Sequence, residues 1–224
     1  MAKAYLFLLE NPTNIKAQTE LRTSRAIFDK HNEILDKYSS SKSTTKKINE
    51  VYEVWSVLKP IYMGVPDIEG GKTVLSKNTE LLKKSDEVVS SIIKDFGSKT
   101  KKKDNVALKE VINISGRQRM LSQRLALYYF ANEDFLNLKS EELSKIFEET
   151  YTMFDDALFK LLVCDYNSQK IEDLLGVAMR DWDELKRHKD EFFRNRLSPE
   201  EIYKRTNDLM VTFNKITGLY EKVK

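Results

Sequence analysis

The chain has 224 residues, enough for one large helical domain or two of ordinary size. It is 41% hydrophobic and 33% charged, with only 7 glycines and 4 prolines, which favours long amphipathic helices over a β-sandwich or barrel. The 38 basic and 35 acidic side chains nearly balance, which argues against a dedicated nucleic-acid-binding protein with a strongly basic face. No run approaches the ~20 apolar residues of a membrane span, and "AYLFLL" near the start is too short for a signal peptide.

Helix signals dominate the first half of the chain. Asn11-Pro12 predicts a cap followed by proline at the first helical position, opening a helix that ends near Tyr38. The Ser/Thr/Lys-rich stretch 39–45 predicts a loop. Two further helices are expected at 46–62 and 72–96, separated by the Gly/Pro-containing loop 64–71. The basic stretch 98–105, within "GSKTKKKDN", predicts a solvated linker.

After this linker the helical pattern starts again. Helices are expected at about 106–131, 140–162, 168–193 and 198–223. "SPEE" at 198–201 is a strong start signal, because it combines a serine cap, a proline at the first helical position and a glutamate three residues after the cap.

The two halves resemble each other and indicate an internal repeat. "MAKAYLF", "AIFDK", "VWSVLK" and "NTELL" in the first half match "LALYYFA", "TMFDD", "DWDELK" and "TNDLM" in the second, in the same order. The separation is about 125 residues and grows slightly along the chain, as short loop insertions would produce. The only two tryptophans, Trp55 and Trp182, occupy matching positions, and we expect both in the core.

The repeat predicts an all-α protein of two tandem up-down bundles of the four-helix type. The first would span 1–97 and the second 106–224, with 98–105 between them. In this register the counterpart of 113–124 would precede Met1. We therefore expect the first bundle to lack the start of its opening helix, which leaves two or three turns, and we favour the interpretation that the sequence is a fragment of a longer protein.

The segment "NISGRQRMLSQRLALYY" from Asn113 to Tyr129 is the most unusual of the chain. A helical wheel centred on Leu121 at about 100° per residue predicts a single core stripe, made of Val111, Ile114, Gln118, Leu125 and Tyr128. The opposite side then carries small and polar residues, namely Gly116, Arg119, Gln123 and Ala126. Arg117 and Arg124 lie at the margin of the stripe.

This opposite side suggests a second packing partner. A glycine inside a helix costs about 1 kcal/mol relative to alanine, so a closely approaching backbone is one explanation for Gly116. If the partner is the same helix of a second chain, two Arg119 guanidiniums face each other across a twofold axis. A small planar oxyanion between them would relieve their repulsion and accept hydrogen bonds from both. The alternative is that these arginines extend to water and cover apolar surface.

The motif "ISGRQRMLSQRLA" resembles the P-box of NarX-type nitrate/nitrite sensors. It is more similar to the version in the PilJ/NarX-like domain of type IV pili methyl-accepting chemotaxis transducers, where it opens a four-helix bundle that often occurs in tandem copies. "MAKAYL" at Met1 resembles the continuation of another such box. The resemblance covers essentially the whole chain, although only 116–124 is a specific motif.

The resemblance implies an extracytoplasmic sensory module for bacterial signal transduction. In nitrate-binding members the arginine before the methionine and the glycine three positions earlier contact the anion at a dimer interface, which implicates Arg119 and Gly116. Arg117, Gln123 and Arg124 complete the expected ligand-binding set. Arg117-Gln118 and Gln123 depart from the nitrate sensors and follow the transducer branch, so the resemblance does not fix the ligand.

Other constellations favour no further site. The two histidines, His31 and His188, lack the glutamates of a di-iron bundle, and Cys164 has no recognisable base beside it. We therefore expect no enzyme, no metal and no cofactor. We expect a homodimer through the helix of Gly116 and Arg119, no nucleic acid, and membrane attachment only through segments outside this sequence. The alternative is a stand-alone helical scaffold that binds no small molecule.

Overall fold

The computed structural model describes residues 1–37, 41–97, 106–132 and 141–223. Within these ranges the chain forms nine helices and no strand, which confirms the predicted all-α class. It divides into two compact units, Met1–Lys103 and Asp104–Lys224. The predicted linker 98–105 lies outside the described residues. No helix in the described ranges is both long and apolar enough to span a bilayer.

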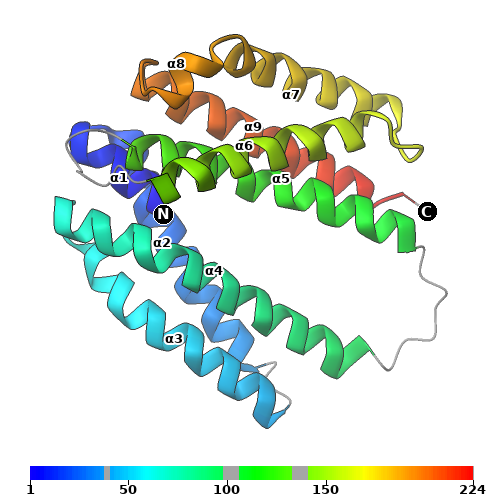
Figure 1. The fold of residues 1–224 in the computed structure, drawn as a ribbon. Helices are drawn as coiled ribbons and strands as arrows, with labels where there is room; N and C mark the ends of the chain where they lie inside the picture. Colours follow the sequence, from blue (N-terminus) through cyan, green and yellow to red (C-terminus); the bar gives the residue numbers. More distant parts are fainter. Residues whose placement is uncertain (38–40, 98–105, 133–140, 224) are drawn as a thin grey trace. The chain divides into compact units, whose positions relative to one another are not determined.

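The first unit contains four helices, which are α1 (Ala2–Glu10), α2 (Ile15–Lys37), α3 (Lys42–Met63) and α4 (Ile68–Gly97). Helix α1 packs on α2 and α4, and α3 packs on the same two helices, so the four form a closed bundle. Consecutive helices run in opposite directions (Figure 1). At 9 residues, α1 has the two to three turns expected of the opening helix.

The second unit contains α5 (Val106–Ala131), α6 (Glu141–Leu162), α7 (Gln169–Arg187), the short α8 (Lys189–Phe193) and α9 (Pro199–Tyr220). Helix α5 packs on α6 and α9, and α7 packs on the same two helices. The cyclic order of the helices is therefore the same as in the first unit, with α5 in the place of α1. The 26 residues of α5 extend about 40 Å at 1.5 Å per residue, as predicted.

Polar caps explain where several helices begin. Ser198 accepts a hydrogen bond from Glu201 N and Pro199 occupies the first turn of α9, as the "SPEE" motif predicts. Ser41 caps α3 by accepting from Thr44 N at 3.1 Å. Asp67 caps α4, since its carboxylate accepts from Gly70 N at 2.7 Å.

The structure corrects four predicted helix boundaries. Helix α2 begins at Ile15, not at Pro12, because Asn14 is the residue whose side chain accepts from the backbone N of Ala17. The predicted loops 39–45 and 64–71 are shorter than expected, because the caps start α3 at Lys42 and α4 at Ile68. The helix expected over 168–193 is interrupted at His188, which separates α7 from α8.

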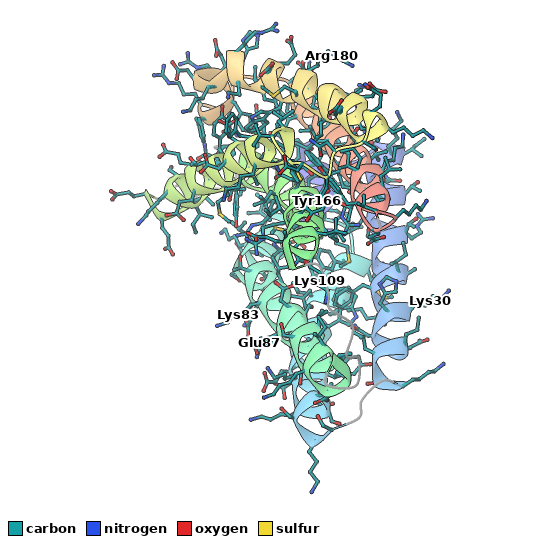
Figure 2. All side chains as sticks on the ribbon, turned by 90° about the vertical axis from the view of Figure 1, so that its right-hand side faces the viewer. Lys30, Lys83, Glu87, Lys109, Tyr166 and Arg180 are labelled. Atoms are coloured by element: carbon teal, nitrogen blue, oxygen red, sulfur yellow. The ribbon has the colours of Figure 1, made fainter. Side chains whose placement is uncertain are left out.

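Each unit has an apolar core, and charged side chains such as Lys83 and Arg180 lie exposed on the helices around it (Figure 2). In the second unit the largest fully buried side chains include Phe147, Phe154, Trp182, Phe192 and Phe213. Trp55 and Trp182 are 4% and 0% exposed, which confirms the predicted core positions of both tryptophans.

Candidate functional site

The guanidinium of Arg119 lies beside Gly116 on α5. Arg119 Nε donates to Gly116 O at 3.3 Å, and Arg119 Nη1 donates to Asn214 Oδ1 of α9 at 2.8 Å. The side chain is half-buried. The remaining three of the five guanidinium N–H groups donate no hydrogen bond within the described residues. These two hydrogen bonds position the guanidinium of Arg119 and leave its other N–H groups available to a ligand.

The space beside Gly116 is open apart from this guanidinium. A Cβ added at Gly116 would meet only Arg119 Nη2, at an ordinary contact distance of 3.6 Å. Among the described residues no neighbouring backbone approaches this position. Packing within the second unit therefore does not explain why the chain tolerates a glycine in the middle of α5.

The predicted core stripe of α5 is confirmed at Gln118, Leu121, Leu125 and Tyr128, which are buried, but it is not the only buried side of the helix. Gln118 Nε2 donates to Phe154 O of α6 at 2.9 Å, whereas Gln123 Nε2 donates to Thr206 O of α9, also at 2.9 Å. Ala126, expected on the outer side, is 0% exposed. Helix α5 contacts both α6 and α9, so it buries two adjacent stripes, and the side with Arg119, Gln123 and Ala126 faces α9 of its own unit.

A third polar contact strengthens the α5–α9 packing. Ser115 Oγ and Thr217 Oγ1 lie 2.8 Å apart in a hydrogen bond, and both side chains are buried. Gln118 is fully buried, and its Oε1 has no hydrogen-bond partner among the described residues. A buried unpaired acceptor costs free energy, so Gln118 is a polar feature that stability alone does not favour.

Arg117 and Arg124, the two arginines at the margin of the predicted core stripe, have different surroundings. Arg117 is exposed. Arg124 Nη2 donates to the hydroxyl of Tyr128, and its guanidinium carbon lies 5.2 Å from the centroid of that ring. Arg124 Nε is buried without a hydrogen-bond partner in the described ranges. The guanidinium of Arg124 therefore interacts with the side chain of Tyr128 on the same helix.

The structure thus brings together Gly116 and Arg119, and places the other predicted site residues elsewhere. Gln123 is engaged by α9, Arg117 points to solvent and Arg124 contacts Tyr128. Asn214 was not identified from the sequence: it is an exposed polar residue on α9, 95 positions from Arg119, and no local pattern distinguishes it.

Metal-binding groups do not cluster in this part of the chain. Across the described ranges, no group of three or more His, Cys, Asp or Glu side chains is placed to hold a metal ion. The side chain beside Gly116 is instead the guanidinium of Arg119, a cationic donor that suits an anion.

The second unit is therefore an all-α bundle whose opening helix carries a candidate anion site. The site consists of a half-exposed arginine next to a glycine with open space beside it. Residues 103–204 match the family model described as the N-terminal region of type IV pili methyl-accepting chemotaxis transducers. The match contains Gly116, Arg119 and Gln123. No curated protein and no solved structure matches the chain.

Proposed function

We propose that this chain is the ligand-sensing module of a bacterial signal-transduction receptor, and that it binds a small oxyanion between two copies of α5. The match of residues 103–204 to the chemotaxis transducer model supports the sensory role. The observation that carries the site is the pair of Gly116 and Arg119, in which a positioned guanidinium with unused donors lies over an open helix surface.

Two copies of this surface would complete the site. With α5 of one copy beside α5 of another, two Arg119 side chains approach across a twofold axis and repel each other. A planar oxyanion between them accepts charge-assisted hydrogen bonds from both and removes this repulsion. The absence of a side chain at Gly116 leaves room for the anion or for the partner backbone.

The match to the transducer model also supports a sensing domain that operates outside the cytoplasm. An anion that binds the pair and not the single copy stabilises the pair by mass action. Ligand concentration is thereby converted into a change of helix packing, which is the kind of output that a transducer passes on.

Calorimetric titration of the purified chain tests this function. We expect heat of binding with at least one of nitrate, nitrite and small carboxylates. Arg119→Ala should abolish the heat of nitrate or nitrite binding, and Arg119→Lys should weaken it, because a point charge cannot replace the planar fork of two N–H groups. Arg180→Ala is the matched control, because Arg180 is an exposed arginine beside Gly176 on α7, outside the expected ligand-binding set.

A stand-alone helical scaffold is the competing function. Its support is the bond from Arg119 to Asn214, which also describes an arginine that only joins α5 to α9. A scaffold would give no heat with nitrate or nitrite, and Arg119→Ala would then change stability alone.

A further inference from the structure

The first unit contains a hollow of about 310 Å³ at the end of its bundle. Its walls come from the C-terminal part of α1, the first turns of α2 and the α3–α4 connection, and they include Leu8, Leu21, Arg22, Arg25, Met63 and Val65. The volume is at the small end of the range of ligand pockets in proteins. All lining residues belong to the first unit, so the hollow does not involve Gly116 or Arg119.

Two arginines line this hollow without a carboxylate partner. Arg22 and Arg25 are three residues apart on α2, which places them on one face of the helix. Neither forms an ion pair among the described residues. Arg25 Nη1 donates to Tyr62 O at 3.1 Å, which fixes its guanidinium against the last turn of α3. The described residues that line the hollow therefore include one positioned cation, a second cation beside it and no carboxylate.

The rest of the lining is apolar. Leu21 and Tyr62 are buried on the inner side, while Met63 and Val65 are 62% and 85% exposed at the rim. Removing apolar surface from water is favourable by roughly 25 cal/mol per Å². A ligand that covers these two side chains would therefore gain binding free energy. The combination of two cations with apolar walls matches a ligand that has an anionic head and an apolar body.

We infer that this hollow binds a small organic monocarboxylate, with its carboxylate on Arg22 and Arg25 and its apolar body against Leu21, Met63 and Val65. A carboxylate matches the geometry of paired guanidinium N–H groups. It also removes the repulsion between two cations on one helix face. The apolar body would cover the rim that water now contacts. This site is separate from the proposed oxyanion site and does not depend on it.

Titration of the full chain with hexanoate, followed by NMR shifts of backbone amides, tests the inference. We expect saturable shifts confined to the residues around the hollow, chiefly 8–25 and 62–66. Acetate keeps the charge without the body, and hexanol keeps the body without the charge. Each should bind at least about tenfold more weakly than hexanoate.

Three variants of the hollow should weaken hexanoate binding. Arg22→Gln and Arg25→Gln each remove one cation and should weaken it about tenfold or more. Because Arg25→Gln also removes the bond to Tyr62 O and threatens the fold, Val65→Glu provides a second route. Val65 is 85% exposed, so this change leaves the core intact and places a like charge at the rim.

Two further variants are controls. Lys30→Gln removes a charge from exposed Lys30 on the same helix, outside the hollow (Figure 2). Arg119→Ala removes the proposed oxyanion site. Both should bind hexanoate like the wild type.

The opposite results would overturn the inference. Equal binding of hexanoate by wild type and by both Arg22→Gln and Val65→Glu would show that the hollow is not the site. Binding of the chain to phosphatidylglycerol vesicles through Met63 and Val65, with no shifts from hexanoate, would show that this rim contacts a lipid surface instead. Loss of hexanoate binding in Arg119→Ala would assign the carboxylate to the other unit.

Discussion

The indole of Trp182 donates a hydrogen bond of 2.7 Å from Nε1 to Asp155 Oδ1 of the preceding long helix. In the first unit Trp55 Nε1 donates to Asp29 Oδ1 at 2.8 Å. In each unit a lysine four residues after the tryptophan donates to the same carboxylate. Each tryptophan also lies 4.5 Å from the ring centroid of the phenylalanine that precedes its aspartate. The two units thus share a core contact down to individual atoms.

This contact predicts that Asp155→Ala destabilises the second unit by about 1–3 kcal/mol, because the buried indole N–H of Trp182 loses its acceptor. Asp29→Ala should cost a similar amount in the first unit. Chemical denaturation measures both changes. The adjacent, exposed Asp156→Ala is the control and should stay within about 0.5 kcal/mol of wild type. If Asp155→Ala is as stable as this control, the bond does not stabilise the bundle.

Gly116→Ala should stabilise the isolated chain by about 1 kcal/mol, because alanine is the better helix former and its Cβ meets only an ordinary contact. Gly218→Ala in α9, where a Cβ meets nothing within 4 Å, should have the same effect. Only Gly116→Ala should also weaken anion binding. A destabilised Gly116→Ala chain would show that packing within the unit requires this glycine.

Gly70→Ala should have the opposite effect. A Cβ at Gly70 collides with the hydroxyl of Tyr5, which accepts a hydrogen bond of 3.1 Å from Asp67 N. The collision should cost roughly 1–3 kcal/mol, typical of overpacking, in the free energy of unfolding. Retained stability would mean that the start of α4 adjusts without strain.

Alkaline pH should destabilise the second unit in part through Tyr151. Burial, and then the nearby carboxylate of Asp155, raise the pKa of Tyr151 to about 12 from its ordinary value of 10.0. Between these values the unfolded chain releases the phenol proton and the folded chain keeps it. The unfolded state then binds fewer protons, so stability falls as the pH rises from 10 towards 12. Denaturation at pH 9 and 11 should show a smaller loss for Tyr151→Phe than for wild type. Equal losses would exclude Tyr151 as a cause.

Much of the fold could be predicted from the sequence because it depends on local signals. Helix periodicity, the "SPEE" cap and the matching tryptophans act within a few residues or repeat along the chain. The environment of α5 could not be predicted, because a helical wheel does not reveal that two neighbours bury two adjacent stripes. For the same reason Gln123 was expected on the outside, although it bonds Thr206 O of α9.

The candidate sites depend even more on contacts that are distant in the sequence. The motif identified Gly116 and Arg119, but not Asn214, which approaches only after α9 has packed on α5. The hollow in the first unit likewise arises from the contact of Arg25 with Tyr62, residues 37 positions apart on different helices. Neither partner stands out in its local sequence.

Sedimentation velocity of the wild-type chain and Arg119→Ala, with and without nitrate, nitrite and small carboxylates, tests the central claim most directly. If an oxyanion bridges two Arg119 side chains, at least one of these anions shifts the wild-type chain towards a dimer by mass action. Arg119→Ala should stay folded and show no such shift. Identical sedimentation of both proteins under every anion would contradict the anion bridge and leave Gly116 and Arg119 as parts of a helical scaffold.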